Sequence, residues 1–340
     1  MLLRRHLDRA FHLGEVRTGG GSRRRLHSVF DRPLRSAPRP RGDRAVKTRF
    51  DIHNRRHAEG LLAAVIFARS TSFLLVKHCL TAFDVFNLLA VRFTIAAVLL
   101  VILFNRRLRG LKLITLARGA VLGVVFFAVM AGETIALSKT SSSTTALVES
   151  SAIMLVPFLT WAFFHDKPTR ANVCAAVVAF VGVVFTIGQT GHIVLSPGIL
   201  WCLGTAVIYA LSVIVTDTLS KRDDAIALGV IQVAVMALCS VVATCLVESP
   251  TLAAPGSVWG NVLYLAVVCS VFGFAIQPYA QSGTTSDRAS LFLAITPATA
   301  TVLGVVILHE TLTWLGAIGV ALILSSFFLA NRPPKWLRSY

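Results

Sequence analysis

The stretch AVIFA at residues 64–68 returns as AVIYA at residues 206–210, 142 positions later. Two further pairs of segments repeat at offsets of 144 and 140 residues: ALSKTSS at 136–142 with AQSGTTS at 280–286, and LLAVR at 88–92 with LGVIQ at 228–232. Three repeats at nearly one spacing indicate two homologous halves joined end to end. In an apolar chain, such a duplication is typical of membrane proteins that bind a solute between their repeats.

The composition places the chain in a membrane. Of its 340 residues, 55% are hydrophobic and 14% are charged, and the mean hydropathy is +0.72. A soluble domain of this length needs more polar surface, so the predicted fold class is an all-α polytopic membrane protein. The net charge of +17 resides mainly in residues 1–57, which carry 16 Lys or Arg and 5 Asp or Glu. We therefore expect no nucleic-acid partner for the membrane part.

Residues 1–57 are rich in Arg, Gly and Pro and contain no apolar run long enough for a signal peptide. We predict a basic, disordered cytosolic tail. A start codon placed too far upstream, with the true start near Val46, would explain the same composition. A transit peptide fits less well because five acidic residues are interspersed. Binding of nucleic acid or anionic lipid by the tail is a further alternative.

Ten apolar runs of about 18–23 residues are long enough to cross a hydrocarbon core of roughly 30 Å. The first five lie at 60–78, 87–104, 119–138, 145–164 and 171–188, and the second five at 198–219, 225–247, 258–280, 289–308 and 313–330. We assign residues 60–188 to a first repeat, 198–330 to a second repeat and 331–340 to a short basic cytosolic tail.

Lys and Arg gather in the loops of one side. With the basic tail inside, the cytosolic loops become 105–118, 165–170, 218–224 and 281–288, and they hold ten Lys or Arg. The opposite loops hold at most Lys77 and Lys139, so we predict a plasma- or inner-membrane protein with both termini in the cytosol. Since each half has an odd number of spans, the second half must cross in the opposite sense. The predicted architecture is therefore ten transmembrane helices in two inverted five-helix repeats.

The membrane part resembles the EamA-type branch of the drug/metabolite transporter superfamily. The resemblance rests on SLFLAITP at 290–297, Gly304 and LHETL at 308–312 in the second half. In the first half it rests on NLLAVRFT at 87–94 and on Asp166 in the place of the acidic turn residue. The resemblance implies a ten-helix transporter fold over about residues 60–330. The first span departs from the family, because Arg69-Ser70 stands where a Trp-Gly pair is usual, and no substrate preference is carried over.

Glu133 is the principal candidate for a transport residue. A charge at the bilayer centre costs about 2.5–3.5 kcal/mol on insertion scales, so an ionisable group inside a span needs a reason. Glu133 lies well inside the third span, and the repeat aligns it with Gln277 at an offset of 144. Desolvation could raise the pKa of such a carboxyl group enough to carry a proton. The alternative is a structural carboxylate paired with Arg69 or Arg92.

The other polar candidates have competing interpretations. Arg69 faces either a cavity or a carboxylate, and Arg92, which the repeat aligns with Gln232, either lines the cavity or snorkels to the interface. Glu149 either extends the polar wall or pairs with Lys139. Tyr209 replaces Phe67 of the first repeat, so its hydroxyl is a candidate cavity group.

Three prolines interrupt helical hydrogen bonding and are hinge candidates: Pro157, Pro278 and Pro297. His309 and Glu310 are adjacent, but no second His stands at the HExxH spacing, so we expect no metal site and no cofactor. Lys77, at the end of the first span, is expected to snorkel to the interface.

These observations predict a secondary transporter that exports small metabolites, amino acids or drug-like solutes by alternating access. Proton coupling through Glu133 or Glu149 is a hypothesis that rests on their burial. A non-transporting scaffold or receptor is the first alternative, and an intramembrane enzyme is the second, although no nucleophile–base pair stands at matching depth. Lipid and a small solute are the expected partners, and the sequence leaves open the substrate, the direction, the coupling ion and pairing as a homodimer.

Overall fold

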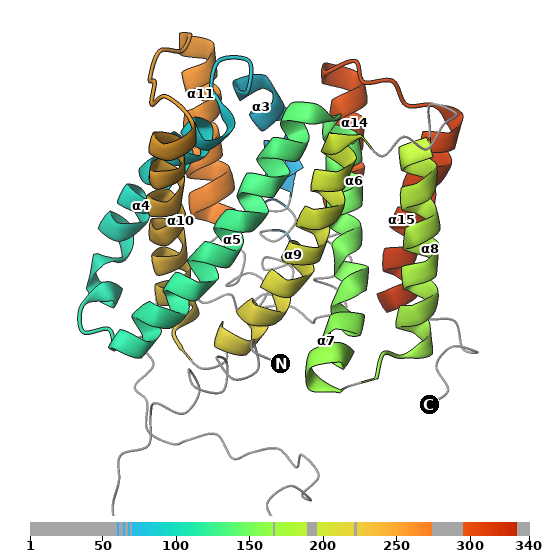
Figure 1. The fold of residues 1–340 in the computed structure, drawn as a ribbon, viewed down its shortest axis with the longest axis horizontal. Coiled ribbons are helices and arrows are strands. Elements are labelled where there is room, and N and C mark those ends of the chain that lie inside the picture. The colour runs from blue at the N-terminus through green and yellow to red at the C-terminus, as the bar shows by residue number, and fades with distance from the viewer. Residues whose placement is uncertain are drawn as a thin grey trace, which may run out of the picture. The chain divides into compact units, whose positions relative to one another are not determined.

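The protein is helical wherever its structure is described. The computed structural model describes residues 60, 64, 67–68, 70–165, 167–188, 196–220, 223–273 and 295–331, and these contain helices, turns and no strand. Figure 1 shows the helices lying side by side, with the two ends of the bundle formed by their connecting loops. The chain divides into two units, Met1–Asp51 and Ile52–Tyr340, and the described residues all belong to the second.

The helices follow the predicted apolar runs closely. In the first half they are α3 Ser72–Cys79, α4 Val85–Leu108, α5 Leu113–Lys139, α6 Ser142–Ser151, α7 Val156–Phe164 and α8 Arg170–Ile187. In the second half they are α9 Pro197–Ser220, α10 Ala225–Val247, α11 Gly256–Tyr264, the π-helix η3 Leu265–Phe272, α14 Ile295–Ile307 and α15 Trp314–Asn331.

Six helical segments are long and apolar enough to cross a membrane: 85–108, 113–139, 142–163, 170–187, 197–216 and 226–247. Three shorter apolar segments, 256–272, 296–307 and 314–330, lie within or overlap the last three predicted spans. Of the first predicted span, 60–78, the structure describes α3 and a few residues before it. The all-helical, multi-pass membrane class is thus confirmed, while ten crossings and their inverted sense stay predictions.

The fourth predicted span, 145–164, is not one continuous α-helix. A 3₁₀ turn at Ala152–Leu155, η1, separates α6 from α7, and Pro157 is the second residue of α7. Proline lacks a backbone N–H and disfavours the α conformation in the preceding residue. The interruption of the helix therefore falls just before Pro157. Pro297 is buried in the first turn of α14, and Pro278 lies outside the described residues.

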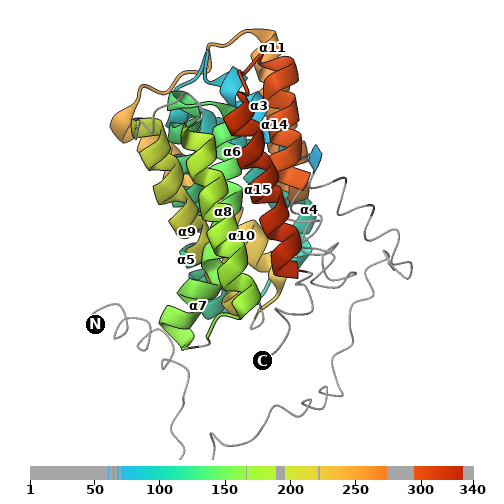
Figure 2. The same cartoon turned by 90° about the vertical axis from the view of Figure 1, so that its right-hand side faces the viewer.

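Helices of the first half pack mainly against helices of the second half. The most extensive pairs are α8 with α15, α4 with α10, α5 with α10, and α5 with α9, and α6 packs on α14. Figure 2 shows α8 and α15 side by side along their length. Small residues allow these close approaches, as is usual where lipid removes the hydrophobic drive between helices.

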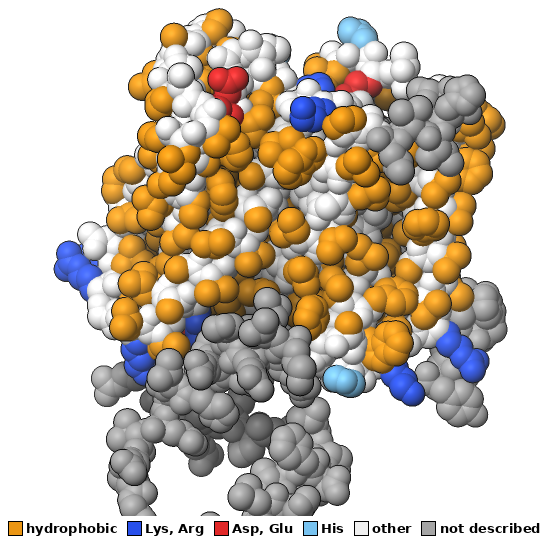
Figure 3. All heavy atoms as spheres, viewed as in Figure 1, with side chains coloured by type: hydrophobic (Ala, Val, Ile, Leu, Met, Phe, Trp, Pro, Cys, Tyr) orange, Lys and Arg blue, Asp and Glu red, His pale blue; other side chains and the backbone are white. Residues whose placement is uncertain are grey.

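The outer surface is apolar around the middle of the bundle. Side chains such as Ile102, Phe180 and Leu246 are more than half exposed, and Figure 3 shows hydrophobic side chains over most of this face, with Lys and Arg toward its ends. An apolar belt of this extent would aggregate in water, so it indicates contact with lipid.

The crossing of α8 and α15 gives a test of the packing. A Cβ atom added at Gly319 would stand 2.5 Å from Thr186 Oγ1 and 2.7 Å from the Gly182 carbonyl oxygen. We expect Gly319→Leu to destabilise the protein by about 1–3 kcal/mol through overpacking, measured as a lower melting temperature in detergent. Gly204→Leu is the matched control, because a Cβ at Gly204 meets nothing within 4 Å. Equal melting temperatures for the two variants would contradict the packing.

Candidate functional site

A carboxylate from the second half caps the first turn of α6. Glu310, in the loop between α14 and α15, accepts hydrogen bonds at Oε1 from Ser142 N (2.6 Å) and Ser142 Oγ (2.8 Å). Its Oε2 accepts from Ser143 N (3.0 Å) and Ser143 Oγ (2.5 Å). The amide groups at a helix start have no intrahelical partner, and a negative charge is favoured there by the helix dipole. The two serines are thus an anion cradle that another part of the chain fills.

The end of α5, which the chain connects to the start of α6 through a short turn, is capped by an ammonium group. Lys77 of α3 donates from Nζ to the carbonyl oxygens of Leu137 (2.6 Å) and Thr140 (2.5 Å), at the end of α5. Lys77 is only partly buried and lies at the end of α3, so the expectation that it snorkels to the interface stays a prediction, with its charge engaged by two backbone carbonyl groups. Lys77 also lies within electrostatic range of Glu310.

Glu248 makes a second cap of the same kind at the start of α4. Its Oε1 accepts a hydrogen bond from Phe86 N (3.0 Å) and its Oε2 from Asn87 N (2.8 Å). The Asn87 side-chain amide donates to the Thr251 carbonyl oxygen at 2.8 Å. Asp84 holds the N-cap position but makes no side-chain cap bond, so the acid that stabilises this helix start comes from the end of α10.

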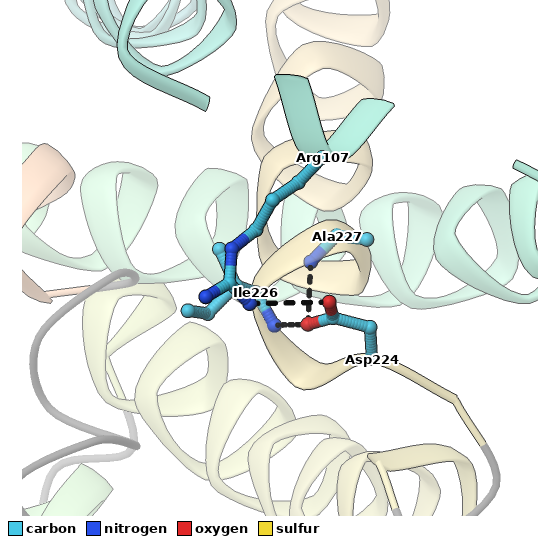
Figure 4. Close-up of polar contacts among 4 residues, drawn as sticks. All are labelled: Arg107, Asp224, Ile226 and Ala227. Atoms are coloured by element: carbon cyan, nitrogen blue, oxygen red, sulfur yellow. Dashed lines mark hydrogen bonds and ion pairs between the residues drawn. The ribbon is translucent and has the colours of Figure 1, made fainter. Parts of the chain in front are cut away.

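The far end of α4 is tied to the start of α10. Asp224 caps α10 by accepting hydrogen bonds from Ile226 N (2.9 Å) and Ala227 N (3.4 Å), and Arg107 of α4 pairs with it at 3.2 Å (Figure 4). The neighbouring Asp223 accepts from Thr115 Oγ1 (2.7 Å) and pairs with Arg118 (2.6 Å), both of α5. Burial tends to raise the pKa of Asp223, but these partners outweigh it and lower the pKa.

Two carboxylates lie inside the bundle on adjacent helices. Glu133 of α5 and Glu149 of α6 are 6% and 7% exposed, and both lie within electrostatic range of the Cys202 thiol on α9. Cys202 Sγ is 3.7 Å from Thr145 Oγ1, one turn before Glu149. We call the region where α5, α6 and α9 meet, with these four side chains and Thr205, the α5–α6–α9 polar cluster.

The polar cluster is closely packed. A Cβ atom added at Gly132, beside Glu133, would overlap Thr205 Oγ1, so α5 and α9 touch at that level. Thr205 is buried, and its hydroxyl oxygen has no hydrogen-bond partner among the described residues. The helices therefore bring Glu133, Glu149 and a buried hydroxyl to one depth, a donor and acceptor set that suits a polar solute or a proton.

Arg92 belongs to a different part of the bundle. It is 5% exposed, and its Nε donates to Ser270 Oγ of η3 at 2.9 Å. The Ser270 hydroxyl in turn donates to the Leu265 carbonyl oxygen, five residues back in the π-helix (3.0 Å). A buried guanidinium held in this way does not reach the interface, so the structure favours a position of Arg92 inside the bundle over snorkelling.

Gln232 lies on α10, 4% exposed, and its Nε2 has no hydrogen-bond partner among the described residues. Helices α4 and α10 run antiparallel, since Glu248 bonds at the start of α4 and Asp224 at its end. Arg92 and Gln232 are each near the start of their helix, so the two aligned side chains lie toward opposite ends of the pair. Tyr209 is partly buried and packs between two hydrophobic clusters, one around α4, α5 and α10 and one around α9.

Arg69, Asp166, Gln277 and Pro278 lie outside the described residues. The repeat alignment of Glu133 with Gln277, and the alternative in which Glu133 pairs with Arg69, therefore stay predictions. Sequence reasoning missed Glu310 and Glu248 as helix caps, because their partners lie more than 160 residues away in the chain.

The chain matches a model of the EamA-like transporter family twice, over residues 58–188 and 196–332. Two proteins of Archaeoglobus fulgidus, each described as an uncharacterized transporter, are similar to it. One is 23% identical over 80% of this chain and 96% of its own length, and the other is 24% identical over 82% and 86%. A solved crystal structure, described only as that of a protein, superposes with a TM-score of 0.62 at 22% identity, over 84% of this chain and all of the other. That likeness concerns the fold alone.

The Glu310 cap predicts a pH dependence of stability. Burial would raise the pKa of this carboxyl group, but the hydrogen bonds from Ser143 and Ser142 outweigh it, and the pKa falls below its ordinary value of 4.5. A lowered folded pKa stabilises the protein above pH 4.5, and this contribution is lost as the pH falls through the folded pKa. We expect Glu310→Gln to cost about 2 kcal/mol at neutral pH and progressively less in acid, measured by thermal unfolding.

Asp84→Asn serves as its control, because Asp84 is exposed and caps nothing with its side chain. A Glu310→Gln deficit that stayed constant from neutral to acid pH would show that the charge of Glu310 is not what stabilises α6.

Proposed function

Because the chain belongs to the EamA-like transporter family, we propose that it is a secondary transporter that exports a small metabolite, amino acid or drug-like solute by alternating access. The single observation that carries the site assignment is the α5–α6–α9 polar cluster. Two carboxylates buried in an apolar bundle are costly to keep, and in membrane proteins such groups mark solute or proton pathways.

The proposal includes an inverted-repeat architecture, with five spans in each half. The family model matches twice, and the helix pairs occur in equivalent sets. If α3, α4, α5 and α6 correspond to α9, α10, α11–η3 and α14, then the α5–α9 pair corresponds to α3–α11, and α5–α10 corresponds to α4–η3. Likewise α6–α9 corresponds to α3–α14, and all of these pairs are in contact. Two such halves can exchange conformations to open either end of the bundle.

Proton coupling through Glu133 or Glu149 is the mechanism that we propose for this site. Burial disfavours the charged form of a carboxyl group, and a second carboxylate nearby disfavours it further. A carboxyl group that takes up a proton on one side and releases it on the other can drive a solute against its gradient. Direct use of ATP is unsupported, because the sequence has no Walker A motif.

Two other classes of function make different predictions. A scaffold or receptor would keep the buried carboxylates for packing, so their replacement would change stability and no flux would be measured. An intramembrane enzyme would need a catalytic group at the polar cluster, and the described residues include no set of three His, Cys, Asp or Glu that could hold a metal ion. The family points to transport.

Flux in proteoliposomes separates these classes. The purified protein would be reconstituted with a panel of amino acids, nucleosides and cationic dyes, and flux would be recorded with and without a pH gradient. We expect at least one solute to move faster than in protein-free vesicles, in the direction opposite to the downhill flow of protons. Protein-free rates for the whole panel, in vesicles where the protein is folded and inserted, would argue for the scaffold.

The polar cluster predicts which substitutions stop transport. Glu133→Gln and Glu149→Gln each replace a titrating carboxyl group with a non-titrating amide of similar size. For a solute found in that panel, we expect gradient-driven flux to fall by about tenfold or more in the variant that lacks the proton-carrying residue. Asp84→Asn, an exposed carboxylate, should leave the flux unchanged. Full pH-dependent flux in both Glu variants would reject the cluster as the proton pathway.

A further inference from the structure

The turn between α5 and α6 is bonded by two side chains from outside this hairpin, Lys77 of α3 and Glu310 of the α14–α15 loop. Thr140 and Ser141 connect the end of α5 to the start of α6, and Ser141 caps α6 locally by accepting a hydrogen bond at Oγ from Thr144 N (3.2 Å). The carbonyl groups that end α5 are bonded by Lys77 of α3, and the amides that start α6 by Glu310. The hairpin therefore depends for both of its helix ends on elements outside it.

The contact at Glu310 is close and shaped by the backbone. A Cβ atom at Gly304 of α14 would overlap Ser143 Oγ and stand 2.5 Å from Glu310 Oε2, so α14 and α6 approach as near as glycine allows. His309 takes a left-handed conformation (φ 52°), which ends α14 and turns Glu310 back over it, with Glu310 N bonded to the Gly304 carbonyl oxygen at 3.0 Å. The turn thus aims the carboxylate at α6.

Helix α6 connects this contact to the polar cluster. Thr145 lies one turn after Ser142 and contacts the Cys202 thiol, and Glu149 lies one turn further on. Exposure of Cys202, and of a path toward Glu149, therefore requires the start of α6 to move away from α9. The caps themselves are charged hydrogen bonds, which form or break as units and so suit a two-state contact.

We propose that Glu310 and Lys77 form a latch that closes this end of the bundle, and that the latch must open in each transport cycle to give solute access to the α5–α6–α9 polar cluster. The proposal rests on the proposed function, and it adds the position of a gate and the two positioning residues that hold it. Under the predicted orientation, this is the outer gate.

The native Cys202 thiol reports whether the latch is open. It is 1% exposed in this closed arrangement. The full-length protein in nanodiscs would be treated with a membrane-impermeant maleimide, and the rate of modification at each cysteine would be read by peptide mass spectrometry. We expect Glu310→Gln to speed the modification of Cys202 by about tenfold, equivalent to about 1.4 kcal/mol in favour of the open arrangement.

A second variant keeps the test informative if Glu310→Gln is unstable. Ser142→Ala with Ser143→Ala removes the two hydroxyl donors and leaves the two backbone donors, so we expect an intermediate rate at Cys202. Asp84→Asn should leave the rate at the wild-type value. Cys269, 2% exposed in η3, reports any general loss of fold.

Three outcomes would overturn the latch. The first is an unchanged modification rate at Cys202 in both latch variants. The second is an equal rise in the modification rates of Cys202 and Cys269. The third is a lowered melting temperature with an unchanged modification rate at Cys202, which would make Glu310 a structural cap only. None of them depends on knowing the substrate. If the flux panel fails while Cys202 responds as expected, Glu310 still closes this end of the bundle, but its role in a transport cycle is rejected together with the transport function. The reverse result leaves transport and rejects the latch.

Discussion

The structure depends on hydrogen-bond partners for helix ends that are partly buried where the loops connect the helices. The first amides and last carbonyls of every helix lack intrahelical partners, and in an apolar medium each unpaired group is costly. Here the start of α6 is capped by Glu310, the start of α4 by Glu248 and the end of α5 by Lys77. Both acids belong to the second stretch that the family model matches, and the helices that they cap belong to the first. In these two carboxylate caps, the second half completes helix starts of the first half.

This capping across the halves holds α4 and α6, the helix that carries Glu149, against the second half. The pair α4–α10 is tied at both ends, by Glu248 and by the Arg107–Asp224 pair, so it forms a firm unit. By contrast, α6 is interrupted by η1 after only ten residues, and its start is held by a loop of the other half. The carboxylates of the polar cluster lie on α5 and on this short helix, next to the contact that we propose opens during transport.

Sequence reasoning found the helices well and the contacts between them poorly. Apolar runs of sufficient length give the helices directly, and buried Glu133, Glu149, Arg92 and Gln232 were found because a polar group inside such a run is conspicuous. Glu310 and Glu248 stand in loops, where an acid is ordinary, and only their distant amide partners reveal them. Lys77 was assigned to the interface because it lies at the end of a predicted span. That position in the sequence does not reveal the Thr140 carbonyl group that lies beside it.

Alternating access is the central claim, and the distances across the two ends of the bundle test it most directly. Spin labels at the exposed positions Asp84 and Thr311 report one end, and labels at Arg109 and His165 report the other. Pulsed electron resonance on the protein in nanodiscs, at several pH values and with the solute found in the flux panel, should give two distances at each end, with one end widening as the other narrows. A single distance at both ends under every condition would contradict the account.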